Sequence, residues 1–437
     1  MDNQILASLK NEQDIEKTAT TSKTREKIFS TSYLMDVFTN LFLYIVHFQL
    51  MLWSTAHALN VWHVSMDIAG LASGAFIIGA LFARIPAGRY INYLGRRRVF
   101  LVGTALFFAI IFFYQLAFSP ATFIIVRLLH GVSFGLSSTA ASTIVATLLP
   151  QSRLGEGIGY FTLGVTIAAA IGPFLTLALP NPDWNIYICL VLGFLIFVFA
   201  FFIKAPEYSL DEKEIQELHS LSIHHFFEFP SLKISFIAAI GGICYSTVLS
   251  FLGAYADHLG LEGFGTTFFF IFFAITSLIS RPITGRLLDA KGGDIVMYPA
   301  LIFLALAMFV LAITTNDILL LTGALLLGFG YATITSACHA LAVHCAPLSH
   351  VGVATSTYFV FLDAGIGVGP YVLGSIVNNF GFPAVYSTSG IISVIGIALY
   401  FFMLGRPGRF TKRQMQRDRE AKSLRHTRRE QRKSLAH

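Results

Sequence analysis

Two charged side chains stand inside long apolar stretches of the sequence. Arg127 lies about seven residues into one stretch, and Asp363 lies twelve residues after Val351 in another. A charge at such a depth in a membrane is costly and marks a functional site by default. Because a buried carboxyl group can bind and release a proton in the physiological range, Asp363 is a candidate proton carrier. The alternative role of each residue is structural: a partner for a buried polar group at Asp363, and a brace between helices at Arg127.

Weaker candidates stand earlier in the chain. Asp36 lies about four residues inside the first apolar stretch, where its carboxylate would reach water at a helix end. An ion pair with Lys233 is the alternative for this carboxylate. Asn40, His47 and Gln49 follow on the same stretch, and each is a candidate polar group of a substrate cavity.

The histidine and cysteine positions argue against a metal site. His339 and His344 are five residues apart, which does not place them on one face of a helix. All four cysteines lie in apolar stretches and are expected to be buried and unpaired. Histidine titrates near neutral pH, so His130, beside Arg127, could relay protons, although a hydrogen-bonded buried histidine is the commoner case. We therefore predict no metal.

The elements that must position these side chains are membrane-spanning helices. Of the 437 residues, 55% are hydrophobic and only 12% are charged, whereas a soluble domain has about 25% charged residues. The apolar residues fall into long blocks, and a helical crossing of a bilayer needs roughly 20 apolar residues. This pattern excludes a soluble enzyme, a disordered chain and a secreted disulfide scaffold. It predicts an all-α, multi-pass membrane protein.

Twelve of these blocks are predicted to cross the membrane as two six-helix bundles. The predicted divisions are an N-terminal segment, a first bundle, a central connection, a second bundle and a basic tail, at residues 1–32, 33–203, 204–230, 231–404 and 405–437. The connection has the pattern of a short amphipathic helix over 209–221. The predicted crossings are 33–56, 67–90, 99–118, 120–149, 156–179, 185–203, 231–256, 264–288, 295–314, 317–346, 351–377 and 383–404.

The positions of Lys and Arg orient these crossings, because cytoplasmic loops attract them. Of the 30 Lys and Arg residues, all except Arg127 are assigned to the termini, the central connection or turns on one side. Arg84 and Arg281 are assigned to two of these turns. Both termini are therefore predicted to be cytoplasmic, with the chain in the cell membrane.

A repeat relates the two predicted bundles. The turn from Arg84 to Gly95 matches the turn from Arg281 to Gly292 at an offset of 197 residues. The same offset relates two other landmarks, Gly131 with Gly328 and Gly172-Pro173 with Gly369-Pro370. The two Gly-Pro pairs predict helix bends, because proline removes a helix hydrogen bond; tight packing is the alternative. Parallel halves of this kind suit a transporter that rocks about a site between them.

The matching turns resemble the cytoplasmic signature of the major facilitator superfamily. The residues that carry this resemblance are Gly88, Asn92, Gly95, Arg96, Arg97 and Arg98, with a weaker copy at Gly285, Asp289 and Gly292. Two further motifs are similar to the family's second motif and, in part, to its drug:proton antiporter motif: Arg127 with Gly131, and Gly159 with Gly172 and Pro173. The chain departs from the family pattern at Asn92, Ala168 and Thr176.

The resemblance implies roles for these residues. The first turn would latch one bundle to the start of the eleventh crossing when the inner side is closed, with Asn92 capping the free N–H groups there. Gly88 and Gly95 would permit close helix approach and an unusual backbone angle. Basic side chains of the turns would hold them at the anionic inner leaflet; these are Arg89, Arg96, Arg97 and Arg98 in the first turn, and Arg286 is the counterpart of Arg89 in the second. Arg127 would face the central cavity.

We therefore expect a secondary active transporter, not an enzyme, that exports a small molecule in exchange for protons. An uptake symporter for a sugar or another metabolite is the alternative. The sequence contains no phosphate-binding Gly-rich loop with Lys and Ser/Thr, so no cofactor is expected and the proton gradient supplies the energy. The expected partners are the substrate, protons and membrane lipids, and the chain is expected to be a monomer. The basic tail is expected to lie beside the membrane and not to bind nucleic acid.

Overall fold

The long elements in the part of the chain that the structure describes are all α-helices. The computed structural model describes residues 27–64, 66–178, 181, 183–210, 215, 226–261, 264–406, 408 and 410. The amphipathic helix predicted at 209–221 and the basic tail fall almost entirely outside these residues. The long helices are α2 (Thr31–Trp62), α3 (Met66–Leu94), α4 (Arg96–Phe113), α5 (Pro120–Leu148), α6 (Leu154–Ala178), α7 (Trp184–Phe202), α9 (Phe229–His258), α10 (Phe264–Lys291), α11 (Asp294–Ala312), α12 (Asp317–Cys345), α13 (Val351–Phe380) and α14 (Phe382–Tyr400).

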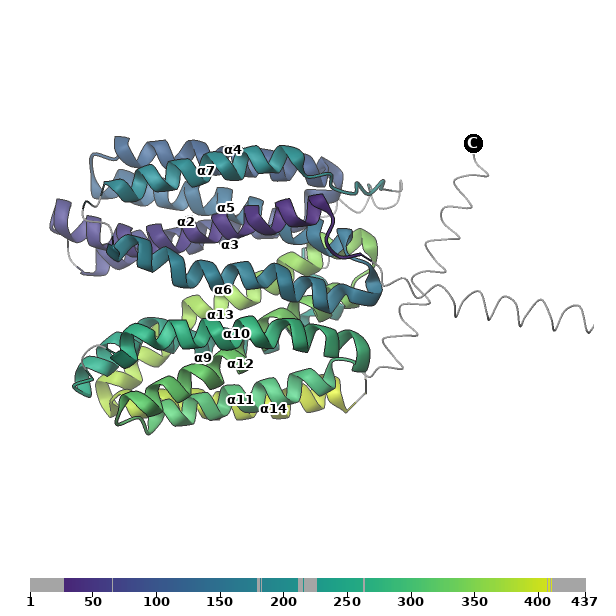
Figure 1. The fold of residues 1–437 in the computed structure, drawn as a ribbon. Coiled ribbons are helices and arrows are strands. Elements are labelled where there is room, and N and C mark those ends of the chain that lie inside the picture. The colour runs from purple at the N-terminus through teal and green to yellow at the C-terminus, as the bar shows by residue number, and fades with distance from the viewer. Residues whose placement is uncertain are drawn as a thin grey trace, which may run out of the picture.

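Eleven of the helices in the described residues are long and apolar enough to cross a membrane. The prediction from the sequence was twelve crossings. The remaining long helix is α3, which has 29 residues and carries Asp67, Arg84 and Arg89. In the structure, α3 lies among the other long helices of its group (Figure 1).

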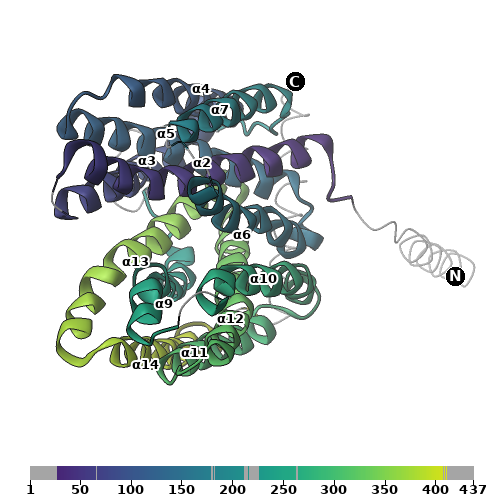
Figure 2. The ribbon, with the colours of Figure 1, turned by 60° about the vertical axis from the view of Figure 1, so that its left-hand side comes forward.

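The helices form two groups: α6 packs along α2 and belongs to the first group, and α13 packs along α9 and belongs to the second. In Figures 1 and 2, α2, α3, α4, α5 and α7 lie together, and α9, α10, α11, α12 and α14 lie together on the opposite side. Two long contacts join the groups, α3 along α13 and α6 along α10. The helices that make these two contacts therefore determine how the groups sit against each other.

The contacts within the groups recur at the offset seen in the sequence. A Cβ atom at Gly131 would lie 1.9 Å from the carbonyl oxygen of Phe76, so only glycine permits α5 to approach α3 this closely. A Cβ atom at Gly328 would lie 2.5 Å from the carbonyl oxygen of Phe273, and both residues of this pair stand 197 positions later. The repeat in the sequence thus corresponds to a repeated helix contact.

The starts of two long helices follow the same repeat. The Ser119 hydroxyl accepts a hydrogen bond from the backbone N–H of Thr122 at the start of α5, over 3.2 Å. The Asn316 side chain, 197 positions later, accepts one from the N–H of Leu319 at the start of α12, over 3.0 Å. Both side chains are good N-caps because they satisfy an N–H group that has no partner within its own helix.

Candidate functional site

A cavity lies between the two groups of helices. Four helices of the first group and four of the second line it, namely α2, α3, α5, α6, α9, α10, α12 and α13. Most of the lining is aromatic or aliphatic. Of the described residues that line the cavity, the charged ones are Arg84, Arg281 and Asp363. Mostly apolar walls with a few convergent polar groups are typical of a small-molecule site.

Arg84 and Asp363 form an ion pair that joins α3 to α13 inside the cavity. Arg84 Nε donates to Asp363 Oδ2 over 2.9 Å, with the arginine side chain 1% exposed and the aspartate side chain 20% exposed. Arg84 also donates to the hydroxyl of Ser138 over 3.0 Å, and its guanidinium lies 4.4 Å from the ring centre of Phe359. The pair therefore links the two groups of helices by a charge contact.

Arg281 enters the same cavity from α10. It is 4% exposed, donates through Nη1 to the carbonyl of Thr162 in α6, and donates through Nη2 to the Thr335 hydroxyl over 3.3 Å. Its Nε has no hydrogen-bond partner in the described part of the chain. This second arginine thus also bridges the two groups, but through uncharged partners.

The assignment of Arg84 and Arg281 to loop turns was wrong. Both are buried inside helices, in α3 and α10. The sequence did contain a signal of this burial. Each arginine stands four residues before the glycine of its turn, Gly88 or Gly285, and this spacing places it about one helical turn of 3.6 residues inside the helix. The count of basic residues alone could not separate a helix end from the helix interior.

Arg127 does not line the cavity, contrary to the role implied by the family resemblance. It is fully buried within the first group, where Nε donates to the carbonyl of Ala72 over 3.0 Å and Nη1 donates to the Tyr114 hydroxyl over 3.3 Å. The same hydroxyl lies 3.0 Å from Nδ1 of His130, which is also buried and outside the cavity lining. The geometry favours the structural alternative, a brace between α5 and its neighbours.

Asp36 is neither solvated nor paired with Lys233. Its carboxylate is fully buried, and neither oxygen has a hydrogen-bond partner among the described residues, whereas Lys233 is exposed at the start of α9. Both expectations for this residue were wrong because Asp36 lies on the face of α2 that packs inside the bundle, and not on a face that reaches water. A buried carboxyl group without a partner is energetically costly as an anion.

The polar residues of α2 divide between the cavity and the packing of the first group. Asn40 and His47 line the cavity, and the His47 ring is stacked between Phe76 and Phe134. The Gln49 amide instead donates to an asparagine of α7 over 3.0 Å. The position of each side chain around α2 therefore determines whether it lines the cavity.

At one end of the molecule, which we call the turn end, the α3–α4 turn contacts the start of α13. The Asn92 amide donates to the carbonyl of Ser349 and accepts from Arg96 Nε over 2.8 Å. Asn92 therefore does not cap the N–H groups at the start of α13, as had been expected. Beside it, a Cβ atom at Gly88 would lie 2.8 Å from the carbonyl oxygen of Gly352, so the two helices cross at close range.

The four basic side chains of this turn divide into two that are buried against protein groups and two that are exposed. Arg89 and Arg96 are 4% and 3% exposed. The Arg89 guanidinium lies 4.1 Å from the ring centre of Phe226, and Arg96 donates to the carbonyl of Pro206 over 2.9 Å. The expectation that all these arginines face the lipid headgroups was therefore wrong for Arg89 and Arg96. Arg97 and Arg98 are exposed.

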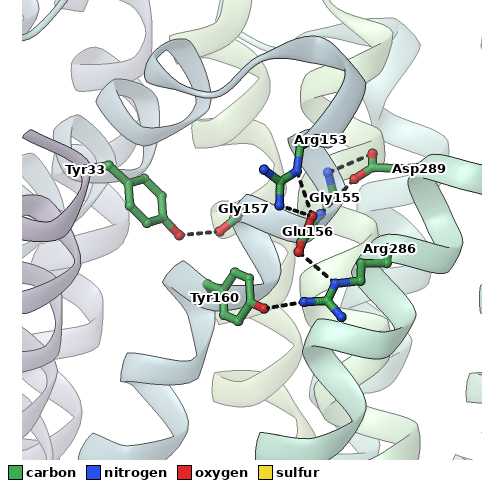
Figure 3. Close-up of polar contacts among 8 residues, drawn as sticks. All are labelled: Tyr33, Arg153, Gly155, Glu156, Gly157, Tyr160, Arg286 and Asp289. Carbon is green, nitrogen blue, oxygen red and sulfur yellow. Dashed lines mark hydrogen bonds and ion pairs between the residues drawn. The ribbon is translucent and has the colours of Figure 1, made fainter. Parts of the chain in front are cut away.

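The turn between α10 and α11, which is the repeat counterpart of the α3–α4 turn, binds the start of α6 through charged groups (Figure 3). The Asp289 carboxylate accepts from the backbone N–H groups of Gly155 and Glu156 over 3.0 and 2.9 Å. Arg286 Nε donates to Glu156 over 2.7 Å, and Arg286 also donates to the Tyr160 hydroxyl over 2.9 Å. The capping expected of Asn92 is thus found at its repeat counterpart, Asp289.

Both turns rely on glycine at a positive φ angle. Gly95 has φ 89° and Gly292 has φ 94°, a region that side chains rarely adopt. The helices with the Gly-Pro pairs are continuous: α6 and α13 run through Gly172-Pro173 and Gly369-Pro370. A Cβ atom at Gly172 would lie 2.9 Å from the backbone nitrogen of Gln49, so this position packs tightly. Bends at the two pairs stay a prediction.

Comparison with known families places the chain. The model of the Major Facilitator Superfamily matches residues 33–317 and 292–435. This chain belongs to the major facilitator superfamily. It is 24% identical over 343 residues to an uncharacterised MFS-type transporter of Methanocaldococcus jannaschii, which covers 76% of this chain and 88% of that one. An uncharacterised MFS-type transporter of Burkholderia mallei is 26% identical over 365 residues, covering 79% and 86%.

Solved structures of the superfamily share the fold. The proton:xylose symporter XylE, bound to 6-bromo-6-deoxy-D-glucose, has a TM-score of 0.69 at 14% identity, over 86% of this chain and 95% of that one. FucP in the outward conformation has a TM-score of 0.67 at 16% identity, over 85% and 99%. The human organic anion transporter MFSD10 has a TM-score of 0.66 at 17% identity, over 84% and 98%.

The superfamily membership confirms the coarse predictions from the sequence. The protein is a multi-pass membrane protein of an all-helical transporter family, and that family carries out secondary active transport, so it is not a class of enzymes. At these identities the solved structures are informative about the fold alone. Proposals about the transport direction and the substrate therefore start from the residues that line the cavity.

Proposed function

We propose that the chain moves a small molecule by alternating access and couples its export to the entry of protons. The observation that carries this proposal is the Arg84–Asp363 ion pair, because it joins the two groups of helices inside the cavity. A ligand shifts a conformational equilibrium only if it binds one state better than the other. A proton on Asp363 meets that requirement, since it changes the contact between the groups.

Proton binding would weaken the pair. A neutral Asp363 leaves Arg84 without its charged partner, and removing one partner from a buried pair costs about 3–5 kcal/mol. The protonated state therefore favours the orientation in which α3 and α13 are apart at this level. Asp36, buried without a hydrogen-bond partner in the described residues, is the second candidate proton site.

The proposed transporter has twelve crossings in two pseudo-symmetric six-helix halves, with both termini in the cytoplasm. The 197-residue offset of the Gly131–Phe76 and Gly328–Phe273 contacts supports the two halves. The basic residues near the turn end support its assignment to the cytoplasm. The turn contacts through Asn92 and Asp289 would then hold the cytoplasmic side closed in this conformation.

The coupling is tested with purified protein in proteoliposomes that contain a pH-sensitive dye. Compounds that move protons in the wild type are screened first, and Asp363→Asn is then compared with Asp36→Asn. We expect Asp363→Asn to abolish compound-dependent proton movement. Exchange of the compound across the membrane without proton movement should persist. Loss of proton movement in Asp36→Asn alone would transfer the coupling role to Asp36.

Uptake by symport is the second candidate function, and the resemblance in fold to a proton:xylose symporter favours keeping it. The direction of the imposed pH gradient separates the two. Antiport predicts that compound leaves the compartment that protons enter. Accumulation of the compound together with inward protons would instead establish symport, and the Arg84–Asp363 coupling would still apply.

A further inference from the structure

The two cavity arginines occupy equivalent positions in the two halves of the chain. Arg281 stands 197 residues after Arg84, and Thr335 stands 197 residues after Ser138. Arg84 donates to the Ser138 hydroxyl over 3.0 Å, and Arg281 donates to the Thr335 hydroxyl over 3.3 Å. The same kind of group therefore orients each guanidinium toward the same cavity.

The two positions differ in the acid that accompanies the arginine. The counterpart of Asp363 at the 197-residue offset is Thr166, which also lines the cavity. Thr166 lies one helical turn beyond Thr162, whose carbonyl accepts from Arg281. The second position thus has a neutral hydroxyl where the first has a carboxylate.

The charge of Arg281 is consequently not balanced within the cavity. Asp363 is the one acid among the described lining residues, and it is paired with Arg84. Arg281 is only 4% exposed, and its Nε has no hydrogen-bond partner in the described residues. A buried charge is costly unless it is paired, and in a membrane such a residue marks a binding site by default.

We propose that Arg281 binds the anionic group of the substrate, and that the substrate is an organic carboxylate with an aromatic body. This inference rests on the proposed transport function. Guanidinium groups match carboxylates in geometry and form strong charge-assisted hydrogen bonds with them. The wall beside Arg281 is aromatic: the rings of Tyr245 and Tyr331 are stacked with centres 4.0 Å apart, and Phe273 lies 5.7 Å from Tyr245.

Binding of matched acids and amides to the full-length protein in nanodiscs tests the proposal. Benzoate, phenylacetate and indole-3-acetate are each compared with the neutral amide of the same body, by thermal shift and by titration calorimetry. We expect an acid to bind at least about tenfold more tightly than its amide, since a hydrogen bond between two charged groups is stronger than one to a neutral group. Equal binding of acids and amides, or no binding by any acid, would overturn the assignment.

Variants of the arginine locate the binding group. Arg281→Gln should lose the preference for the acid, and Arg281→Lys should retain part of it because the charge remains. Preserved acid selectivity in folded Arg281→Gln would show that the anion binds elsewhere.

A variant of Thr166 tests the unbalanced charge without any ligand. Thr166→Asp supplies the acid that the second position lacks, with Thr166→Asn as the uncharged control of the same shape. We expect Thr166→Asp to unfold at a higher temperature than Thr166→Asn and to lose acid binding. A lower midpoint, or unchanged acid binding, would contradict the proposed role of Arg281.

These measurements separate this inference from the proposed function. Acid-selective binding without any transport would leave the Arg281 site intact and overturn the transport proposal. Proton-coupled transport of neutral or cationic compounds that survives Arg281→Gln would leave the transport proposal intact and overturn the anion site.

Discussion

The two junctions at the turn end use the same geometry with different chemistry. At the first junction, α3 crosses α13 at Gly88 and Gly352, and Asn92 donates to a backbone carbonyl. At the second, α10 crosses α6 at Gly285 and Gly155, and a carboxylate accepts from two backbone N–H groups at a helix start. The glycines are repeat counterparts, whereas the polar side chain beside them is a capping carboxylate at Asp289 and a non-capping amide at Asn92.

This difference indicates that the two junctions contribute unequally to closure. A carboxylate at a helix N-terminus gains from both hydrogen bonding and the helix dipole, whereas a neutral amide forms an ordinary hydrogen bond of about 0.5–1.5 kcal/mol. We therefore expect the second junction to carry more of the closure free energy. Spin labels at exposed positions 98 and 291, in a cysteine-free background, report closure as a distance distribution.

The largest effect is expected from closing the space at the glycine contacts. A Cβ atom at Gly285 would lie 2.6 Å from the carbonyl oxygen of Gly155, and one at Gly88 would lie 2.3 Å from the Ser356 Cβ. Gly285→Ala and Gly88→Ala should each shift the labels to long distances, since overpacking costs about 1–3 kcal/mol. Gly74→Ala, also in α3 but with open space around it, is the control. Short distances in both variants would show that the junctions can separate without opening the turn end.

Asp289→Asn is expected to have the next largest effect. The amide retains one acceptor but loses the charge, so the closed state should lose about 1.5 kcal/mol, roughly tenfold in the ratio of closed to open molecules. The distance distribution of the label pair measures this ratio. An unchanged distribution would remove the proposed inequality between the junctions.

Glu156→Gln should have a smaller effect. Arg286 is 52% exposed at this contact, and exposed ion pairs contribute about 0.2–1 kcal/mol. We expect the open population to rise by about fivefold at most. The difference between the variant and the wild type should shrink at high salt, because salt screens the ion pair of the wild type. An effect larger than that of Asp289→Asn would mean that Glu156, and not the cap, holds the second junction.

The smallest effect is expected from Asn92→Ala. The variant loses the hydrogen bond to the Ser349 carbonyl and the acceptor for Arg96, but Arg96 keeps its bond to the Pro206 carbonyl. The closed fraction should fall by less than it does in Asp289→Asn, as read from the same label pair. A larger fall would reverse the order of the two junctions.

Much of the fold was predictable because it depends on local patterns. The long apolar blocks predicted the helices, and the predicted start of α12 at 317 and of α13 at 351 coincide with Asp317 and Val351 in the structure. The start of α2 was less predictable, because Ser30 caps the helix before the apolar block begins. The helix therefore begins at Thr31, two residues before the predicted start at 33.

The candidate site was predictable only in part. Asp363 was identified because a single acid inside an apolar block is visible in the sequence. Its partner Arg84 was missed because the count of basic residues used to orient the helices does not separate a helix end from the helix interior. Arg127 is likewise a single charged residue inside an apolar block, yet it braces the first group of helices and does not line the cavity. The sequence does not distinguish these two roles.

The sequence by itself determined that the chain is a helical membrane protein with a 197-residue repeat, because apolar length and residue spacing are local properties. Only the tertiary structure decided which charged residues meet in the cavity. Arg84 and Asp363 are 279 positions apart, and their contact depends on how α3 packs against α13. The orientation of a side chain around a helix and the partner across an interface are set by packing over the whole molecule, which residue order does not state.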